Sequence, residues 1–166
     1  MLKFYTLSLF IIGFVWGKSS PISIGDSAPD FSMPDENGQI HTLSEYRGQR
    51  VVVYFYPKDD TPGCTKEACG IRDNYSDFTD NQIVVFGVSY DNASSHRKFK
   101  KKFDIPFHLL TDIDKSVSKA YGSDGIFFPS RKTYLISEDG TILKIYDKVD
   151  VLNHADDILR SFSESN

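Results

Sequence analysis

The sequence predicts a single α/β domain in which a central mixed β-sheet is flanked by helices. Two near-continuous apolar runs, residues 51–56 and 83–89, have the length and composition of buried strands. Segments with helical spacing alternate with these runs, as in domains built around parallel strands. Near the C-terminus, two further strands, 133–136 and 142–146, flank a Glu-Asp-Gly turn and form a hairpin, which makes the sheet mixed.

The N-terminal part of the domain is expected to form a β-hairpin. Two short extended pieces, 31–33 and 40–42, are separated by the turn residues 35–38, Asp-Glu-Asn-Gly. Ser44 is then expected to cap a short helical turn before the first buried strand. Pro57 ends that strand.

Four segments are predicted to be helices. The first runs from Cys64 to about Phe78 and places Ala68, Ile71 and Tyr75 on one apolar face with Phe78. The other three are predicted at 94–103, 115–121 and 154–162.

Length and composition limit the classes of protein to consider. The 166 residues fit one domain, and the absence of repeats or linkers assigns residues 21–166 to it. A content of 40% hydrophobic and 25% charged residues is typical of globular proteins. The formal net charge is −4, so no basic excess points to nucleic acid.

Residues 1–20 have the layout of a secretory signal peptide. Lys3 gives a basic start, residues 4–17 are largely apolar, and the cut is expected between Gly17 and Ser20. A retained anchor is the alternative, but about 14 helical residues reach only about 21 Å of the roughly 30 Å hydrocarbon core. We expect an exported protein without stable membrane insertion after cleavage, periplasmic if its source has two membranes and otherwise secreted or membrane-tethered.

The two cysteines, Cys64 and Cys69, are too few for a disulfide framework or a structural zinc site. Cys64 follows the loop that leaves the first buried strand, and Pro62-Gly63 place it in the first turn of a helix. Free backbone N–H groups and the helix dipole favour a thiolate there. Cys64 is therefore a candidate nucleophile, with a buried structural cysteine as the alternative.

The spacing of the two cysteines restricts how they can pair. Residues five apart on an α-helix have Cα atoms about 8.6 Å apart, whereas a disulfide needs less than about 7 Å. A Cys64–Cys69 bond therefore requires the first turns of the helix to unwind. This predicts a redox switch, although Cys69 could instead be a plain core residue.

Other reactive side chains carry weaker signals. Glu67 could contact Arg131 or Arg72, or face solvent, and the sequence leaves these alternatives open. The four histidines are scattered along the chain and lack the spacing of a metal motif. We therefore expect them to be surface or core residues, and we expect no metal and no cofactor. They are His41, His96, His108 and His154.

The pattern Pro57-x-x-x-Thr61-x-x-Cys64 resembles the active-site motif of peroxiredoxins. Thr-Pro-Gly-Cys-Thr followed by Cys69 is similar to the Q-type branch, also called bacterioferritin comigratory proteins. Further similar segments support the resemblance, which covers about residues 24–159; they are 51–56, 67–73, the Ser95-His96 pair and 129–134. The resemblance implies a thioredoxin-like fold.

The resemblance also implies an activity, that of a thiol peroxidase in antioxidant defence. Such an enzyme reduces hydrogen peroxide and organic hydroperoxides to water and alcohols. Cys64 would be the peroxidatic cysteine that becomes a sulfenic acid, and Cys69 the resolving cysteine that forms an intramolecular disulfide with it. A thioredoxin-type dithiol would reduce this disulfide again, and resolution within one chain implies a monomer.

Four further residues take roles from the resemblance. Thr61 would hydrogen-bond the peroxide, and Arg131 would stabilise the thiolate and the leaving oxygen. Pro57 would shield the sulfenic acid, and the backbone N–H groups of Gly63 and Cys64 would orient the peroxide. Taken singly, Pro57 could merely end a strand, Thr61 cap a turn and Arg131 be a solvated charge.

Two other functions compete with a peroxidase. A thioredoxin-class thiol–disulfide oxidoreductase would share the fold, but it would carry Cys-x-x-Cys, whereas Cys64 and Cys69 enclose a longer segment. A non-enzymatic binding domain would keep a permanent disulfide and a thiol unreactive towards peroxide.

Overall fold

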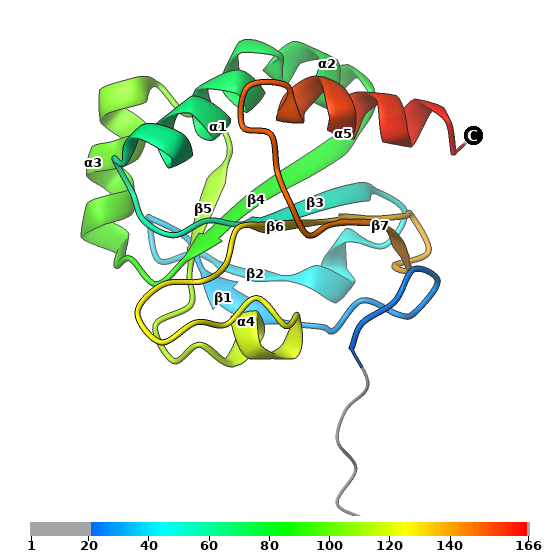
Figure 1. The fold of residues 1–166 in the computed structure, drawn as a ribbon, viewed down its shortest axis with the longest axis horizontal. Coiled ribbons are helices and arrows are strands. Elements are labelled where there is room, and N and C mark those ends of the chain that lie inside the picture. Colours follow the sequence, from blue (N-terminus) through cyan, green and yellow to red (C-terminus); the bar gives the residue numbers. More distant parts are fainter. Residues whose placement is uncertain (1–20, 166) are drawn as a thin grey trace, which may run out of the picture.

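The structure, a computed structural model, describes residues 21–165, so the predicted signal peptide lies outside the described residues. A five-stranded sheet forms its centre in the order β5-β4-β3-β6-β7 (Figure 1). β3, β4 and β5 are parallel, and β6 and β7 are antiparallel to their neighbours, which confirms the predicted mixed sheet. The strands are β3 (Arg50–Phe55), β4 (Ile83–Ser89), β5 (His108–Thr111), β6 (Lys132–Ile136) and β7 (Ile142–Tyr146).

Helices and a small hairpin cover the two faces of the sheet. Helices α1, α2 and α5 lie over one face, and α3 packs beside them at the β5 end (Figure 1). The opposite face carries the hairpin and α4 (Figure 1). The helices are α1 (Pro62–Asp73), α2 (Tyr75–Asp80), α3 (Ala93–Phe103), α4 (Ser116–Ala120) and α5 (His154–Ser163), with the 3-10 helix η1 (Leu43–Tyr46) after the hairpin. Among the described residues, none of these helices has the length and apolar content to span a membrane.

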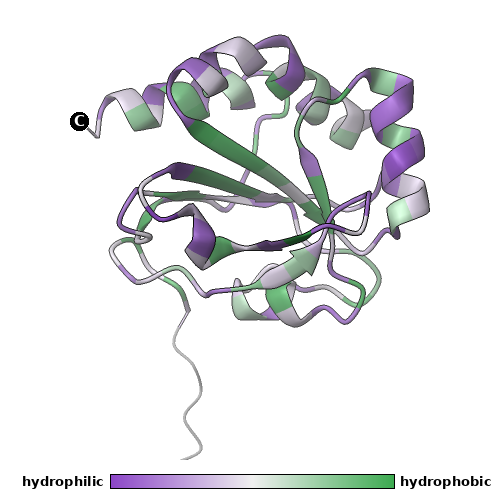
Figure 2. Ribbon diagram, turned by 180° about the vertical axis from the view of Figure 1, so that it is seen from behind, coloured by the Kyte–Doolittle hydropathy of each residue, from purple (hydrophilic) through white to green (hydrophobic). Residues whose placement is uncertain are grey.

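Side-chain alternation along β3 divides the core into two apolar clusters. Val52 and Tyr54 point towards α1 and α5, whereas Val51, Val53 and Phe55 point towards the hairpin and α4. The long strand β4 is hydrophobic along most of its length (Figure 2). Burial on both faces explains why β3 reads as a continuous apolar run.

The N-terminal hairpin consists of β1 (Ser32–Pro34) and β2 (Ile40–Thr42), paired antiparallel as predicted. Gly38 closes its turn with φ +84°, a conformation that favours glycine. A bridge between Asp35 and Leu110 joins the end of β1 to β5. The hairpin therefore lies against the outer strand of the central sheet.

Two local predictions were wrong, and one strand was missed. The helix predicted over 64–78 is divided at Asn74, whose side chain donates a hydrogen bond to the Gly70 carbonyl (2.9 Å). Strand β5 was not predicted at all. Ser44 lies inside η1, which Thr42 precedes, so it does not cap the helix; its N–H donates to the Asp30 carboxylate (2.9 Å).

Candidate active site

The start of α1 places Cys64 at the carboxyl end of the central strand. Thr61 has extended backbone and precedes the helix, Pro62 occupies its first position, and the Thr65 N–H donates to the Thr61 carbonyl (2.8 Å). Helix geometry leaves the N–H groups of Gly63 and Cys64 without an intrahelical acceptor. The Cys64 side chain is buried, at 2% exposure, in the core cluster beneath the helix.

The loop before α1 is fixed by a buried polar group. Asp59 accepts hydrogen bonds from Tyr56 Oη (2.7 Å) and from His96 Nδ1 on α3 (2.9 Å). Its own N–H donates to the Asp91 carboxylate (2.9 Å). These contacts connect the loop to α3 and to the segment after β4, so the N-terminus of α1 is held from two sides.

Arg131 directly precedes β6, which pairs with β3, and it reaches Cys64 from there. The β3–β6 register pairs Phe55 with Lys132, so the residue before β6 lies beside the carboxyl end of β3. Arg131 Nη2 lies 3.2 Å from Cys64 Sγ and donates to it. A Cβ atom at position 63 would lie 3.3 Å from the same nitrogen, so Gly63 gives the guanidinium room to approach.

Glu67 holds the other side of the same guanidinium. It lies one turn after Cys64 on α1, is 1% exposed, and accepts a short hydrogen bond from Arg131 Nη1. Burial raises the pKa of Glu67 to about 7, and Arg131 opposes this rise. Burial alone would lower the pKa of Arg131, but Glu67 and Cys64 raise it, so the guanidinium stays charged. This resolves the alternatives for Glu67 in favour of Arg131.

Behind Glu67 lie two residues that the sequence did not single out for this site. His154, the first residue of α5, has Nε2 3.7 Å from Glu67 Oε1 and 2.8 Å from Thr133 Oγ1. Burial, and then the charge of Arg131, lower the pKa of His154 to about 4, so its ring is neutral at pH 7. Because residues from three separate segments meet here, no local motif could have identified the group.

Tyr54 lies in the same core cluster as Cys64, on the helix-facing side of β3. Its hydroxyl is fully buried, and no hydrogen-bond partner for it occurs within residues 21–165. Burial, with smaller contributions from Glu67 and Cys64, raises the pKa of Tyr54 far above its usual range. Tyr54 therefore adds no negative charge beside a Cys64 thiolate.

The other predicted site residues lie nearby but make different contacts. Thr61 is half-buried, and its hydroxyl donates to the Lys58 carbonyl (3.0 Å), which leaves the oxygen lone pairs available to accept. Pro57 is half-buried and follows the strand end. Cys69 is half-buried on α1, and both cysteines are free thiols, as expected for the reduced form of a helix that carries both.

Comparisons with known proteins identify the family of the chain. The AhpC/TSA family profile matches residues 24–145. The chain is 41% identical over 149 residues to a bcp peroxiredoxin of Coxiella burnetii, covering 83% of this chain and 97% of that protein. It is 44% identical over 129 residues to the chloroplast peroxiredoxin Q of Oryza sativa subsp. japonica, covering 76% of this chain but 59% of that longer protein.

A solved structure supports the same assignment. The bacterioferritin comigratory protein of Xanthomonas campestris superposes with a TM-score of 0.79 at 28% identity, covering 87% of this chain and 97% of that one. The fold, the cysteine at the start of α1 and the sequence relatives lead to one conclusion. The chain belongs to the AhpC/TSA family and is a peroxiredoxin similar to the Bcp and Q proteins.

Proposed function

We propose that the protein is a thiol peroxidase in which the Cys64 thiolate attacks the O–O bond of hydrogen peroxide or an organic hydroperoxide. The attacked oxygen becomes part of a Cys64 sulfenic acid, and the other leaves as hydroxide or alkoxide, which takes a proton to become water or alcohol. The contact between Arg131 Nη2 and Cys64 Sγ, at 3.2 Å, carries this proposal. Alkyl peroxide reduction activity is the subject of the Xanthomonas campestris structure, which supports the same substrate class here.

The residues around Cys64 supply donors where negative charge develops. The guanidinium faces the sulfur, and the N–H groups of Gly63 and Cys64 are free at the helix start. Thr61 precedes α1, and its oxygen can accept the hydroperoxide proton in a hydrogen bond while its own proton goes to the Lys58 carbonyl. We assign to Pro57, at the end of β3, the exclusion of water from the sulfenic acid.

We propose that Cys69 resolves the sulfenic acid. Its thiolate attacks Cys64 Sγ, hydroxide leaves and is protonated to water, and a disulfide forms. Both cysteines lie within α1, where helix geometry separates their Cα atoms by about 8.6 Å, beyond the roughly 7 Å limit. The first turns of α1 must therefore unwind before the bond can form.

A dithiol of the thioredoxin type completes the proposed cycle. Two electrons from this donor reduce the Cys64–Cys69 disulfide to two thiols and leave the donor as a disulfide. We propose that a monomer performs all these steps, since both cysteines belong to one chain.

We also propose that residues 1–20 direct export and are then removed. Intact-mass analysis of the mature protein tests this by locating the new N-terminus.

Two cysteine variants of the full chain test the function. Cys64→Ser should consume no hydrogen peroxide, because the nucleophile is lost. Cys69→Ser should react once, giving a sulfenic acid that a dimedone probe labels, but should not turn over with a thioredoxin-type donor. Full peroxidase activity in Cys64→Ser would contradict the nucleophile, and normal turnover of Cys69→Ser with that donor would contradict the resolving role.

A further inference from the structure

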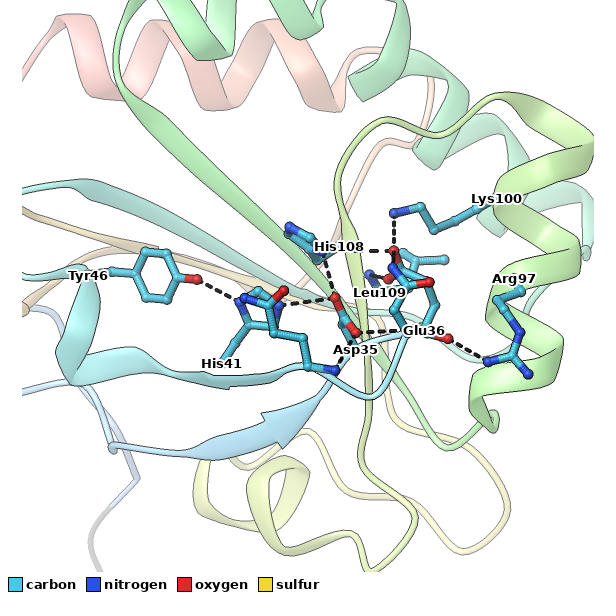
Figure 3. A network of polar contacts seen from close by, with 10 residues as sticks. Asp35, Glu36, His41, Tyr46, Arg97, Lys100, His108 and Leu109 are labelled. Atoms are coloured by element: carbon cyan, nitrogen blue, oxygen red, sulfur yellow. Dashed lines mark hydrogen bonds and ion pairs between the residues drawn. The ribbon is translucent and has the colours of Figure 1, made fainter.

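A second cluster of reactive side chains lies where the N-terminal hairpin meets β5, away from α1. Asp35, His41 and His108 place one potential ligand atom each within 4.8 Å of one another (Figure 3). Asp35 Oδ2 is hydrogen-bonded to His41 Nε2 (3.2 Å) and lies 3.0 Å from His108 Nδ1. In a tetrahedral zinc site with bonds of about 2.0–2.1 Å, neighbouring ligand atoms are about 3.3 Å apart. The two separations from Asp35 are therefore already close to those in such a site.

Hydrogen bonding does not account for the position of His108. Its Nδ1 is buried and makes no hydrogen bond with any described residue, although Asp35 Oδ2 is at hydrogen-bond distance. The direction between the two atoms is therefore unsuitable for a hydrogen bond. Such a geometry is expected when neighbouring atoms both point towards a shared third position, as ligands of one ion do.

Surrounding groups hold the ligands as a metal site requires. His41 Nδ1 lies 2.6 Å from Tyr46 Oη, so the second ring nitrogen has the outer partner that fixes a ligating histidine. The two oxygens of Asp35 divide their partners. Oδ1 accepts the N–H groups of Asn37 (2.8 Å) and Gln39 (3.0 Å), while Oδ2 faces both histidines.

Charge around the cluster also favours a cation. The Asp35 carboxyl is 1% exposed and its Oδ2 faces both histidine nitrogens, so it supplies an acceptor for a cation at the position they share. The nearby Lys100 is neutralised by its 2.5 Å ion pair with Glu36, whose Oε1 lies 3.8 Å from His108 Nδ1.

We propose that Asp35, His41 and His108 form a zinc site that fastens the β1–β2 hairpin to β5. Two imidazole nitrogens and one carboxylate oxygen are a ligand set that suits Zn²⁺. The His108 side chain is 41% exposed, and a groove of about 340 Å³ runs beside it and Tyr46, which provides an entry path and room for a water as fourth ligand. The sequence predicted no metal because His41 and His108 are 67 positions apart and share no motif.

Zinc titration of the full chain carrying Cys64→Ser and Cys69→Ser tests the site without interference from thiols. We expect one Zn²⁺ per chain by competition with a chromophoric chelator, absorption bands of tetrahedral Co²⁺ with that probe, and a rise in thermal midpoint on adding Zn²⁺. Tyr46→Phe should weaken Zn²⁺ binding about 10-fold, the lower end of what loss of an outer partner costs.

Substitution of the ligands gives the decisive comparison. His108→Gln alters a half-exposed side chain, so the fold is expected to persist, and it should weaken Zn²⁺ binding more than Tyr46→Phe does. His154→Gln, at a buried histidine outside the cluster, is the control for loss of a histidine and should leave Zn²⁺ binding unchanged. Two results would overturn the proposal: no Zn²⁺ binding in the parent chain, or equal binding in the His108→Gln and His154→Gln variants. Far-UV circular dichroism checks that each variant is folded.

Discussion

At the residue scale, one guanidinium makes two different contacts beside Cys64, and the proposed chemistry depends on it. Arg131 donates through Nη2 to the sulfur and through Nη1 to the buried carboxylate of Glu67. The planar fork of arginine suits this arrangement, because its donors are fixed relative to one another. The sequence can nominate Arg131 and Glu67 but cannot pair them, since Glu67 could also contact Arg72 or face solvent. In the structure Arg72 instead donates to the Phe103 carbonyl (2.6 Å).

Loss of the guanidinium should slow the oxidation of Cys64. We expect Arg131→Met to lower the second-order rate constant with hydrogen peroxide by about 100- to 1,000-fold, the effect of removing one preorganised donor from a developing charge. The only tryptophan, Trp16, lies outside the described residues, so quenched-flow alkylation with mass spectrometry is the suitable measurement.

Lys132→Met is the matched control for the loss of positive charge. Lys132 is the next residue, and it pairs with Asp147 (2.8 Å) away from the sulfur. The control should react at nearly the original rate. An equal loss of rate in both variants would show that net charge, rather than the placed donor, drives the reaction.

The buried carboxyl of Glu67 should leave a signature in the pH dependence of stability. Glu67 ionises near pH 4.5 in the unfolded chain, but burial raises its pKa to about 7 in the folded protein. Between these values the folded state keeps a proton that the unfolded state has lost, so this group's contribution to stability falls as pH rises. His154 has the opposite effect because burial lowers its pKa from 6.5 to about 4. Between these values the unfolded state binds the extra proton, so this group's contribution to stability rises with pH.

Glu67→Gln removes the first contribution and keeps the second. The stability of the variant relative to the original protein should therefore increase from pH 4.5 to 7, by roughly 3 kcal/mol at about 1.4 kcal/mol per pKa unit. Urea unfolding at several pH values measures the difference. A difference that does not change with pH would mean that Glu67 titrates alike in the folded and unfolded states.

At the scale of the element, α1 must satisfy two opposing requirements. In the proposed cycle its intact first turn presents Cys64 to the peroxide, yet the same turns must open before Cys69 can reach the oxidised sulfur. Gly70 in the helix interior weakens the helix, because glycine costs about 1 kcal/mol relative to alanine there. The break at Asn74 limits α1 to a short segment that can open separately from α2.

Strengthening the helix should slow disulfide formation without slowing peroxide attack. A Cβ atom at position 70 would meet only the Val151 carbonyl at 3.9 Å, so Gly70→Ala fits. If opening limits resolution, a gain of about 1 kcal/mol should slow disulfide formation about fivefold. Quenched-flow trapping of the sulfenic acid and the disulfide measures both steps.

Ser76→Ala is the matched control because it raises the helix propensity at an exposed position of α2 instead of α1. It should leave the rate of disulfide formation unchanged. A Gly70→Ala variant that resolves as fast as the original protein would argue that opening of α1 is not the limiting step.

The elements differ in how far sequence patterns could predict them. The runs that became β3 and β4 were recognisable because burial on both faces requires continuous apolar residues. Strand β5 has four residues, begins with a histidine and lies at the edge of the sheet, so no periodic pattern revealed it. The break at Asn74 escaped prediction because Tyr75 and Phe78 continue the helical spacing across it.

At the scale of the whole molecule, the sheet assembles the active site from distant segments. The parallel β3–β4 pair and the antiparallel β3–β6 pair bring the start of α1 and Arg131 to one end of β3. α5 packs on α1 and adds His154 from near the C-terminus. A sequence pattern can nominate Cys64 and Arg131, but only strand register and helix packing determine that Glu67 and His154 join them.

The most direct test of the proposed cycle is to map the cysteines after one equivalent of hydrogen peroxide is added to the reduced full chain. Trypsin cleaves after Lys66, between the two cysteines, so a Cys64–Cys69 bond yields two linked peptides. We expect these peptides together with an intact mass of one chain less two hydrogens. Two unmodified thiols after peroxide treatment, or a bond that joins two chains, would contradict it.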